Sequence, residues 1–323
     1  MKAVLLGSGW RAQFYHRISH ALPELLTISA VCTHDRERAL ALRKAGINAF
    51  YQIEEALAAD HDTVIAAGSP ALFAERMHFL MNRGESVISE TSFLSLSDEE
   101  NSAFLTMKGV VAEQYPFTPL YASVIASLPL IGNVSQLSVS GLHNHHAAAI
   151  ARLILDLDDR MPDEILSRDF SSSITKTGAR DRIIRTKEQE AYTRKLRILS
   201  FGDRLFISDF STNQYHSALY GKKIEVRGEY GVITEEGIRC VNSEGDAVFL
   251  PFIFHRGHAA GNTTLTLSHV SAGERTVFTN PFYPAGLNDD EIGIALILSS
   301  YSQKRDCPTI RDGVLDARLG RLL

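Results

Sequence analysis

The chain has 323 residues, of which 45% are hydrophobic and 22% charged, and its formal net charge is −5. This length exceeds the usual single-domain size and predicts two domains. Lys and Arg form no basic run, which argues against nucleic acid as a partner, because phosphate binding needs clustered positive charge. The longest apolar runs are about strand length, short of the roughly 20 residues that span a bilayer. We therefore expect no membrane partner.

The start of the chain and its cysteines indicate the cellular compartment. The start of the chain leads directly into a glycine turn, which is not typical of a secretory signal, so a cytoplasmic protein is expected. The three cysteines, Cys32, Cys240 and Cys307, are widely spaced and odd in number. Such spacing fits neither a metal cluster nor a disulfide framework.

Short apolar runs alternate with helical patterns over the first part of the chain. Strands are predicted at Ala3–Leu6, Thr27–Cys32, Thr63–Ala67, Ser86–Ser89 and Val110–Ala112, and helices at Ala12–Leu22, Arg36–Ala45 and Ala71–Arg83. Gly84 is the expected C-cap of the last of these helices. This alternation is typical of βαβ units and predicts an α/β fold, a doubly wound parallel sheet of the Rossmann type.

The pattern changes beyond about residue 120. Further strands are predicted at Val134–Ser140, Arg204–Ser208, Lys223–Arg227, Gly231–Ile233, Ala247–Phe254 and Thr263–Val270. A run of strands after a run of βα units indicates an α+β domain with a largely antiparallel sheet. We predict a dinucleotide-binding Rossmann domain over 1–119 and an α+β substrate and oligomerisation domain over 120–323. The late helix Asp289–Tyr301 is expected to pack back on the first domain.

The segment from Gly7 to Ala12 fits the pattern G-x-G-x-x-A between a strand and a helix. Gly7 permits the tight turn, Gly9 lets a pyrophosphate approach the backbone, and Ala12 lets helix and strand pack closely. The helix N-terminus offers N–H donors to the phosphates. The neighbours Ser8, Trp10 and Arg11 are expected at the same site. The alternative is a plain glycine turn in another α/β protein.

The end of the second strand predicts cofactor preference. An acidic residue there would bind the ribose 2′-hydroxyl and favour NAD. Thr33 occupies that position, with Arg36 and Arg38 nearby, and arginine can pair with a 2′-phosphate. This favours NADP weakly over NAD. Asp35 could still be the acid if the strand ends two residues later.

These motifs together resemble the Gfo/Idh/MocA family of NAD(P)-dependent oxidoreductases. The resemblance runs through most of the chain. It rests on the glycine turn and on the segments Val64–Pro70, Glu90-Thr91-Ser92, Glu113–Pro119, His143–His146 and Asn288–Ile292. It implies that Gly68, Ser69, Pro70, Glu90 and Thr91 lie at the cofactor. It also implies a sugar, cyclitol or similar polyol as substrate, and a homo-oligomer, a dimer or tetramer.

Two residues depart from the family's pattern. Thr91 stands where the family carries the lysine of Glu-Lys-Pro, and Ala149 stands where an aspartate commonly follows the histidine segment. Two of the three usual catalytic groups are therefore absent. Such a chain could use other groups, act as an imine-type reductase, or be a non-catalytic dinucleotide-binding sensor or partner subunit.

Hydride transfer at a carbonyl or alcohol also requires a group that moves a proton. His146 is the predicted acid/base, with His143 as an orienting or substrate-binding partner on the same helical face. Helix capping or metal binding is the alternative for these histidines. No further ligands stand at a recognisable zinc spacing, so no metal is predicted.

Three other residues are candidates for the site. Tyr115 could donate a hydrogen bond to a carbonyl, or simply pack. Lys176 could supply the missing cation, and Arg180 could bind an anionic group of the substrate, although loop Lys and Arg are most often solvated. The sequence thus predicts an NAD(P)-dependent oxidoreductase of a small polar metabolite.

Overall fold

The computed structural model describes residues 1–179, 182–214, 217–258 and 265–323. The chain divides into two compact units. The first consists of Met1–Pro119, Arg256–Ser268 and Asn280–Val314, and the second of Leu120–His255, His269–Thr279 and Leu315–Leu323. Among the described residues, no helix has the length and apolar character needed to cross a membrane.

The first unit contains a six-stranded sheet in the order β3-β2-β1-β4-β5-β6, with every pairing parallel. Its strands are β1 (Lys2–Leu6), β2 (Thr27–Cys32), β3 (Ala49–Phe50), β4 (Thr63–Ala66), β5 (Val87–Ser89) and β6 (Gly109–Val111). The strand order reverses between β1 and β4, as in dinucleotide-binding folds. The predicted Rossmann sheet is confirmed.

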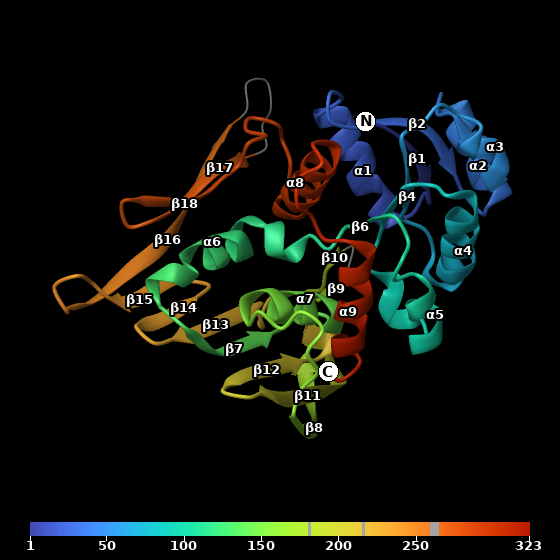
Figure 1. Ribbon diagram of the computed structural model, residues 1–323. Helices are drawn as coiled ribbons and strands as arrows, with labels where there is room; N and C mark the ends of the chain where they lie inside the picture. The colour runs from blue at the N-terminus through green and yellow to red at the C-terminus, as the bar shows by residue number, and fades with distance from the viewer. Residues whose placement is uncertain (180–181, 215–216, 259–264) are drawn as a thin grey trace. The chain divides into compact units, whose positions relative to one another are not determined.

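The helices of this unit alternate with the strands (Figure 1). They are α1 (Trp10–Ala21), α2 (Arg36–Lys44), α3 (Ile53–Leu57), α4 (Phe73–Arg83) and α5 (Asp98–Ala103). The central strands are almost completely buried, with Leu5 and Ile65 at 0% exposure. Strands covered by helices on both faces read as continuous apolar runs, which is why the sequence predicted them. Gly84 ends α4 in the left-handed conformation, as expected.

The late helix α8 (Asp289–Ser302) belongs to the first unit and lies beside α1 (Figure 1). Arg17 of α1 forms an ion pair with Glu291 of α8. Asn288 and Glu291 form a capping box that fixes the start of α8. The expectation that this helix returns to the first part of the chain is confirmed.

The second unit is built on a larger sheet. The strands of that sheet follow the order β18-β17-β16-β15-β14-β13-β7-β12-β11-β8, and of the described pairings only β7 with β12 is parallel. They are β7 (Val134–Ser140), β8 (Glu164–Thr175), β11 (Gln189–Phe201), β12 (Arg204–Phe210), β13 (Lys223–Gly228), β14 (Gly231–Thr234), β15 (Gly237–Val241), β16 (Ala247–His258), β17 (Leu265–Ala272) and β18 (Arg275–Thr279). The predicted largely antiparallel sheet is confirmed.

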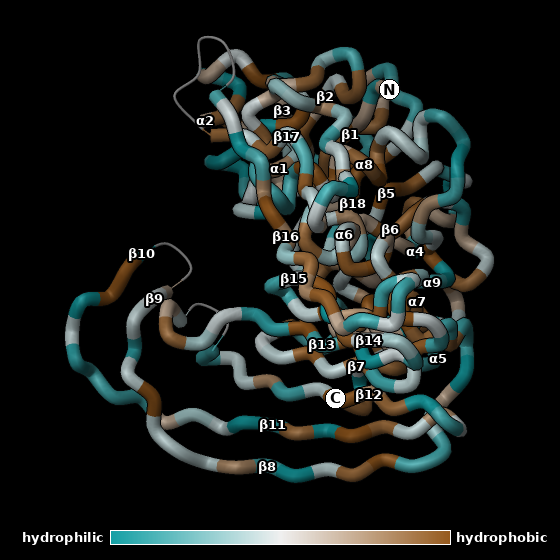
Figure 2. Tube along the Cα trace, turned by 90° about the vertical axis from the view of Figure 1, so that its left-hand side faces the viewer, coloured by the Kyte–Doolittle hydropathy of each residue, from teal (hydrophilic) through white to brown (hydrophobic). Residues whose placement is uncertain are grey.

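Two strands of this sheet form a long ribbon. β8 and β11 pair over twelve residues, and in Figure 2 they run side by side. The short pair β9 (Gly178–Ala179) and β10 (Arg182–Ile183) lies between them in the chain. The sequence analysis did not predict β8 or β11. The helix that follows β7 is α7 (Asn144–Ile154), whose apolar face is buried.

Five more helical segments bear on the site or lie near the end of the chain. These are α6 (Pro119–Ser127), α9 (Ile310–Gly320) and the short 3-10 turns η1 (Pro70–Leu72), η2 (Ser92–Ser95) and η3 (Tyr115–Phe117). The helix predicted over 71–83 is thus divided into η1 and α4. Ser69 caps η1 through its hydroxyl, which accepts a hydrogen bond from the Ala71 N–H at 3.3 Å.

Candidate functional site

The turn after β1 is held closed by Gly7. Its φ is +141°, a conformation that favours glycine, and its N–H donates to the Cys32 carbonyl at 2.8 Å. A Cβ at this position would collide with the carbonyl oxygen of Ala67, which follows β4. The fold itself therefore requires glycine at position 7.

Gly9 differs from Gly7. It is the N-cap residue of α1, its φ is an ordinary −81°, and no described atom lies within 4 Å of where its Cβ would stand. Its lack of a side chain leaves open space at the head of a helix, where backbone N–H groups have no intrahelical acceptors. An anion can use that space and those donors. Ala12, fully buried, allows α1 to pack closely on the sheet. These residues fit the pyrophosphate of a dinucleotide.

The end of β2 lies next to this turn. Thr33 is 2% exposed, and its hydroxyl accepts a hydrogen bond from the Ser8 hydroxyl at 3.0 Å. The Asp35 carboxylate caps α2 by accepting from the Arg38 N–H at 3.1 Å. Arg36 is exposed on the first turn of α2. The first carboxylate after β2 is thus engaged with a helix terminus, and a threonine occupies the place expected of a ribose-binding acid.

A cavity of about 380 Å³ opens at this end of the sheet. Its lining comes from the end of β2, from the segment before and into α3, and from α4: Cys32, His34, Tyr51, Gln52, Ile53, Glu54, Leu72, Glu75, Arg76 and Phe79. Ligands of open α/β sheets bind outside the carboxyl ends of the strands, and this edge belongs to the half of the sheet that takes the adenosine. The sequence analysis named none of these residues as site residues.

Arg76 is the polar group of most interest in that cavity. Its Nη1 atom is buried and has no hydrogen-bond partner within the described part of the chain. Gly68 makes room for it, because a Cβ at position 68 would collide with the Arg76 guanidinium. A buried donor without a partner is costly, and a ligand that offers an acceptor would relieve that cost.

A hydrogen-bonded network lies at the carboxyl ends of β5 and β6. Arg11 donates from Nε to Glu90 Oε2 at 2.6 Å and from Nη2 to Gln114 Oε1 at 2.6 Å. The Tyr15 hydroxyl donates to the other oxygen of Glu90 at 2.5 Å. Glu90 and Gln114 are buried, and Tyr15 is fully enclosed. The network ties the first helix after the glycine turn to the far half of the sheet.

Burial and charge act against each other in this network. Burial raises the pKa of Glu90, while Arg11 and the Tyr15 hydroxyl oppose that rise. Burial is the largest single effect on Arg11 and disfavours its charge, but Glu90, Tyr15 and Asp290 together outweigh it, so the pKa of Arg11 is raised. Burial, followed by the charge of Glu90, raises the pKa of Tyr15. Arg11 therefore stays a cation throughout the physiological range.

Thr91 immediately follows Glu90 and precedes η2. It is half-buried, and its hydroxyl carries no charge at neutral pH. The cation that contacts Glu90 comes instead from Arg11, 79 residues earlier in the chain. The sequence analysis placed Arg11 at the cofactor but did not foresee this ion pair.

The histidines lie in the second unit, at the start of α7, where the sequence predicted them. His143 is the N-cap residue, with an extended backbone, and His146 is 7% exposed. The ring centroids of His143 and His146 are 6.5 Å apart, and those of His145 and His146 are 3.9 Å apart. Ala149 lies on the buried side of the same helix. The acid/base role of His146 and the substrate-binding role of His143 stay predictions.

The remaining candidates are placed as follows. Tyr115 begins η3 in the first unit, is 2% exposed, and donates from its backbone N–H to Glu113 Oε1 at 3.1 Å. Lys176 follows β8 in the second unit, with Nζ 3.8 Å from a carboxylate oxygen of Glu190. Arg180 lies outside the described residues. The catalytic roles proposed for Tyr115 and Lys176 stay predictions.

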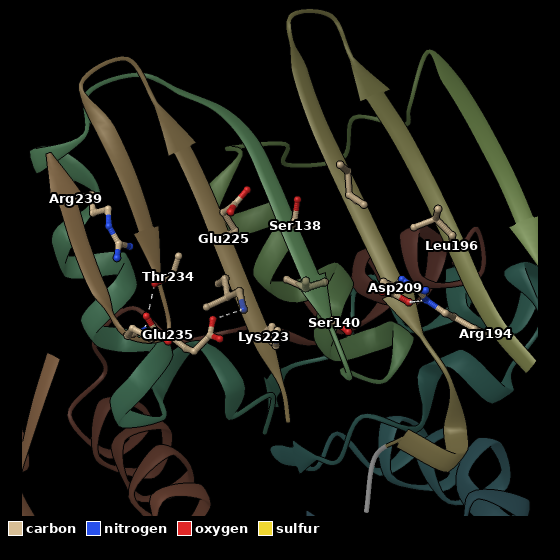
Figure 3. A pocket seen from close by; sticks show the side chains of 14 residues that line it. Ser138, Ser140, Arg194, Leu196, Asp209, Lys223, Glu225, Thr234, Glu235 and Arg239 are labelled. Atoms are coloured by element: carbon tan, nitrogen blue, oxygen red, sulfur yellow. Dashed lines mark hydrogen bonds and ion pairs between the residues drawn. The ribbon is translucent and has the colours of Figure 1, made fainter. Parts of the chain in front are cut away.

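A second hollow, of about 510 Å³, lies on the sheet of the second unit (Figure 3). Its lining residues come from β7 and from β11 to β15, and they include none of the predicted site residues. Arg194 and Asp209 point toward one another there and form two hydrogen bonds of 2.6 Å. Because these opposite charges satisfy each other, the hollow is a weaker candidate than the strand ends of the first unit.

The sheet order and the open glycine turn define the first unit as a Rossmann fold of the dinucleotide-binding type. A search with protein-family models finds no match, and a search of curated proteins finds none either. Solved structures, in contrast, match the chain over nearly its whole length.

Three of these structures are oxidoreductases or dehydrogenases. An oxidoreductase from Agrobacterium radiobacter, in complex with NAD+, L-tartaric acid and magnesium, shares 16% identity over 99% of this chain and 94% of its own, with a TM-score of 0.63. A myo-inositol dehydrogenase from Corynebacterium glutamicum shares 17% over 99% and 94%, with a TM-score of 0.59. An oxidoreductase from Thermotoga maritima shares 15% over 100% and 95%, with a TM-score of 0.61. At such identities the matches establish the fold, which agrees with the predicted Rossmann domain followed by a largely antiparallel sheet.

Proposed function

We propose that this protein is an NAD(P)-dependent oxidoreductase that moves a hydride between nicotinamide and a small polar metabolite with a sugar-like alcohol or ketone. One observation carries the proposal: the space at Gly9, which the packing of the protein does not require, opens at the N-terminus of α1 beside the point where the strand order reverses. Neighbours of the same fold support it, since one of them is in complex with NAD+ and another is a myo-inositol dehydrogenase.

The residues of the chain would divide the work as follows. The turn at Gly7 and Gly9 holds the pyrophosphate on backbone N–H groups, and Thr33 with Ser8 faces the adenosine ribose. The bound nicotinamide supplies the hydride or accepts it. Glu90 and Arg11 shape the far end of the site through their ion pair. His146 is the proposed group that gives or takes the proton at the reacting oxygen.

NADP is proposed as the preferred dinucleotide. The Asp35 carboxylate caps α2 through one oxygen, and Thr33 stands where an acid that selects the 2′-hydroxyl of NAD is expected. Arg36 is exposed on the same helix and carries a charge that a 2′-phosphate can use. Parallel titrations with NADPH and NADH decide this point, and tighter binding of NADH would reverse the assignment.

The test of the function uses Trp10, the only tryptophan of the chain, which is 51% exposed on the first turn of α1. Cofactor binding should change its fluorescence. A panel of sugars, polyols and their acids should then contain a compound that is turned over. His146→Ala should lower kcat by about 100-fold or more while cofactor affinity changes little, because general acid–base catalysis contributes about 10²–10⁴. An unchanged rate would remove His146 from the mechanism.

A non-catalytic sensor or partner subunit is the second candidate. It is favoured by Thr91, a neutral residue beside Glu90, and by Ala149, a methyl group on the buried side of α7. A sensor would bind the dinucleotide and turn over nothing in the panel. Under that function, Thr91→Lys should create dehydrogenase activity that the natural protein lacks.

A further inference from the structure

Beside Glu90, the lysine of the family's pattern is absent, and the guanidinium of Arg11 is the cation that contacts the carboxylate. Thr91 gives no cation, yet the guanidinium of Arg11 lies 2.6 Å from the Glu90 carboxylate. Arg11 stands in the first turn of α1, between the exposed Trp10 and the buried Ala12. Its side chain contacts Glu90 and Gln114, which lie 79 and 103 positions later in the chain.

The position of this guanidinium within the sheet indicates what it can reach. Its two partners, Glu90 and Gln114, follow β5 and β6, which are the strands of the second half of the Rossmann fold. That half accepts the second mononucleotide of a dinucleotide, whereas the first half with β2 and β3 accepts the adenosine. On the proposed function, Arg11 therefore lies at the end of the site where nicotinamide and substrate meet.

The guanidinium also retains capacity for a ligand. Glu90 and Gln114 occupy Nε and one N–H of Nη2, and Nη1 makes no hydrogen bond within the part of the chain that the structure describes. The side chain is 18% exposed. A guanidinium has five donors in a rigid fork, and two parallel N–H groups match the two oxygens of a carboxylate. Because a guanidinium keeps its charge at neutral pH, it cannot transfer a proton to the substrate as a lysine can.

We propose that Arg11 binds a carboxylate of the substrate, so that the sugar-like metabolite is a polyhydroxy acid rather than a neutral polyol. This inference rests on the proposed function and narrows its substrate class. Arg11 takes the place of the absent lysine only as a cation, because it cannot serve as the proton donor. Glu90 and Gln114 hold the guanidinium in position, so the charge does not have to be ordered when the substrate binds.

The test compares a charged probe with an uncharged one of the same carbon skeleton. L-Tartrate and L-threitol are titrated into the protein, with and without saturating NAD+, and Trp10 fluorescence is read. Trp10 reports on this region because Phe14 contacts both residues. The centroid of the Phe14 ring lies 4.7 Å from that of the Trp10 ring and 5.1 Å from Cζ of Arg11. L-Tartrate should bind at least about tenfold more tightly than L-threitol, and Arg11→Met should remove that difference.

Controls separate substrate binding from support of Glu90. Arg11→Lys should keep part of the preference for tartrate. Arg11→Met/Glu90→Gln leaves no unpaired buried carboxylate, so it should fold and still show no preference. Arg11→Met/Thr91→Lys should regain the preference, because lysine returns the cation to the family's position. If Arg11 only stabilised Glu90, its substitution would leave the ratio of the tartrate and threitol affinities unchanged.

The outcomes are distinct. Equal binding of the two probes by the natural protein, or tartrate binding that survives Arg11→Met, would overturn the inference. Failure of NAD+, and of NADP+ titrated in the same way, to change Trp10 fluorescence would instead overturn the proposed function, while the titration without dinucleotide would still report on Arg11.

Discussion

Gly7 and Gly9 are two residues apart but are glycine for different reasons. Gly7 has a positive φ, and a side chain there would collide with the Ala67 carbonyl, so the fold selects it. Gly9 has an ordinary φ and an open surrounding, so the fold does not. A residue that is small without a structural need indicates space kept for a ligand. This contrast is the most direct evidence in the chain for a bound dinucleotide.

The contrast gives a matched pair of substitutions. Gly9→Asp should leave the free energy of unfolding unchanged or slightly higher, because aspartate is a good N-cap, but should abolish NAD(P)H binding through charge repulsion. Gly7→Ala should destabilise the protein by about 1–3 kcal/mol through backbone strain. Urea unfolding and cofactor titration of both variants check this. A Gly9→Asp protein that binds NADH and NADPH normally would contradict the assignment of the site.

At the residue scale, local patterns predicted only part of the site. Gly7, Gly9 and Thr33 could be named as candidates because each follows a strand at a fixed distance, whereas Glu90 was named through the family resemblance. The partner of Glu90 could not, since Arg11 is 79 residues away and a single sequence holds no signal of that contact. Arg76 was missed for a related reason: nothing in a helical pattern tells which polar residue turns inward.

At the element scale, burial decided which strands the sequence predicted. The bounds of β2 and β7 agree with the prediction, because β2 ends in a buried apolar run and β7 alternates apolar and polar residues. Almost every residue of β8 is exposed, so neither pattern marks it. A usable signal was overlooked at α5, where Ser97 and Glu100 form a capping box.

The helix α8 shows how one element supports the site from outside it. Gly293 lies in α8, and its Cβ, if present, would stand 2.8 Å from the Gln114 carbonyl oxygen and 3.2 Å from the Gln114 Cβ. The close approach of α8 thus fixes the segment that begins η3 and carries an acceptor of Arg11. The packing of α8 and the geometry of the Arg11 hydrogen-bond network are therefore coupled.

Substituting Gly293 tests that coupling. Gly293→Ala gains about 1 kcal/mol of helix propensity but costs about 1–3 kcal/mol in overpacking, so we expect a net loss of roughly 1 kcal/mol in urea unfolding. Tartrate affinity should fall because Gln114 shifts. Ser302→Ala, an exposed change in the same helix, should stay within about 0.5 kcal/mol. Higher stability of Gly293→Ala would show that α8 can move away from Gln114 at little cost.

At the scale of the whole molecule, the Arg11–Glu90 pair links the proposed site to global stability. Glu90 is a buried carboxylate, and burial raises its pKa above the ordinary value of 4.5. The folded state therefore holds this proton more tightly than the unfolded chain does, so the free energy of unfolding falls as pH rises through that range. Arg11 limits the fall, because its charge favours ionised Glu90.

Removing Arg11 should therefore destabilise the protein in a pH-dependent way. In Arg11→Met the pKa of Glu90 rises further, so the loss of stability relative to the natural protein should be small near pH 4.5 and should grow with rising pH. Above the pKa of Glu90 in the variant it should level off, at about 3–5 kcal/mol, the typical cost of leaving one partner of a buried pair unpaired. Urea unfolding at several pH values between 5 and 8 measures the gap. In a Glu90→Gln background, where this carboxylate no longer titrates, Arg11→Met should lose most of that slope. A gap that is constant with pH in the natural background would mean that Arg11 stabilises the fold by packing rather than by its charge.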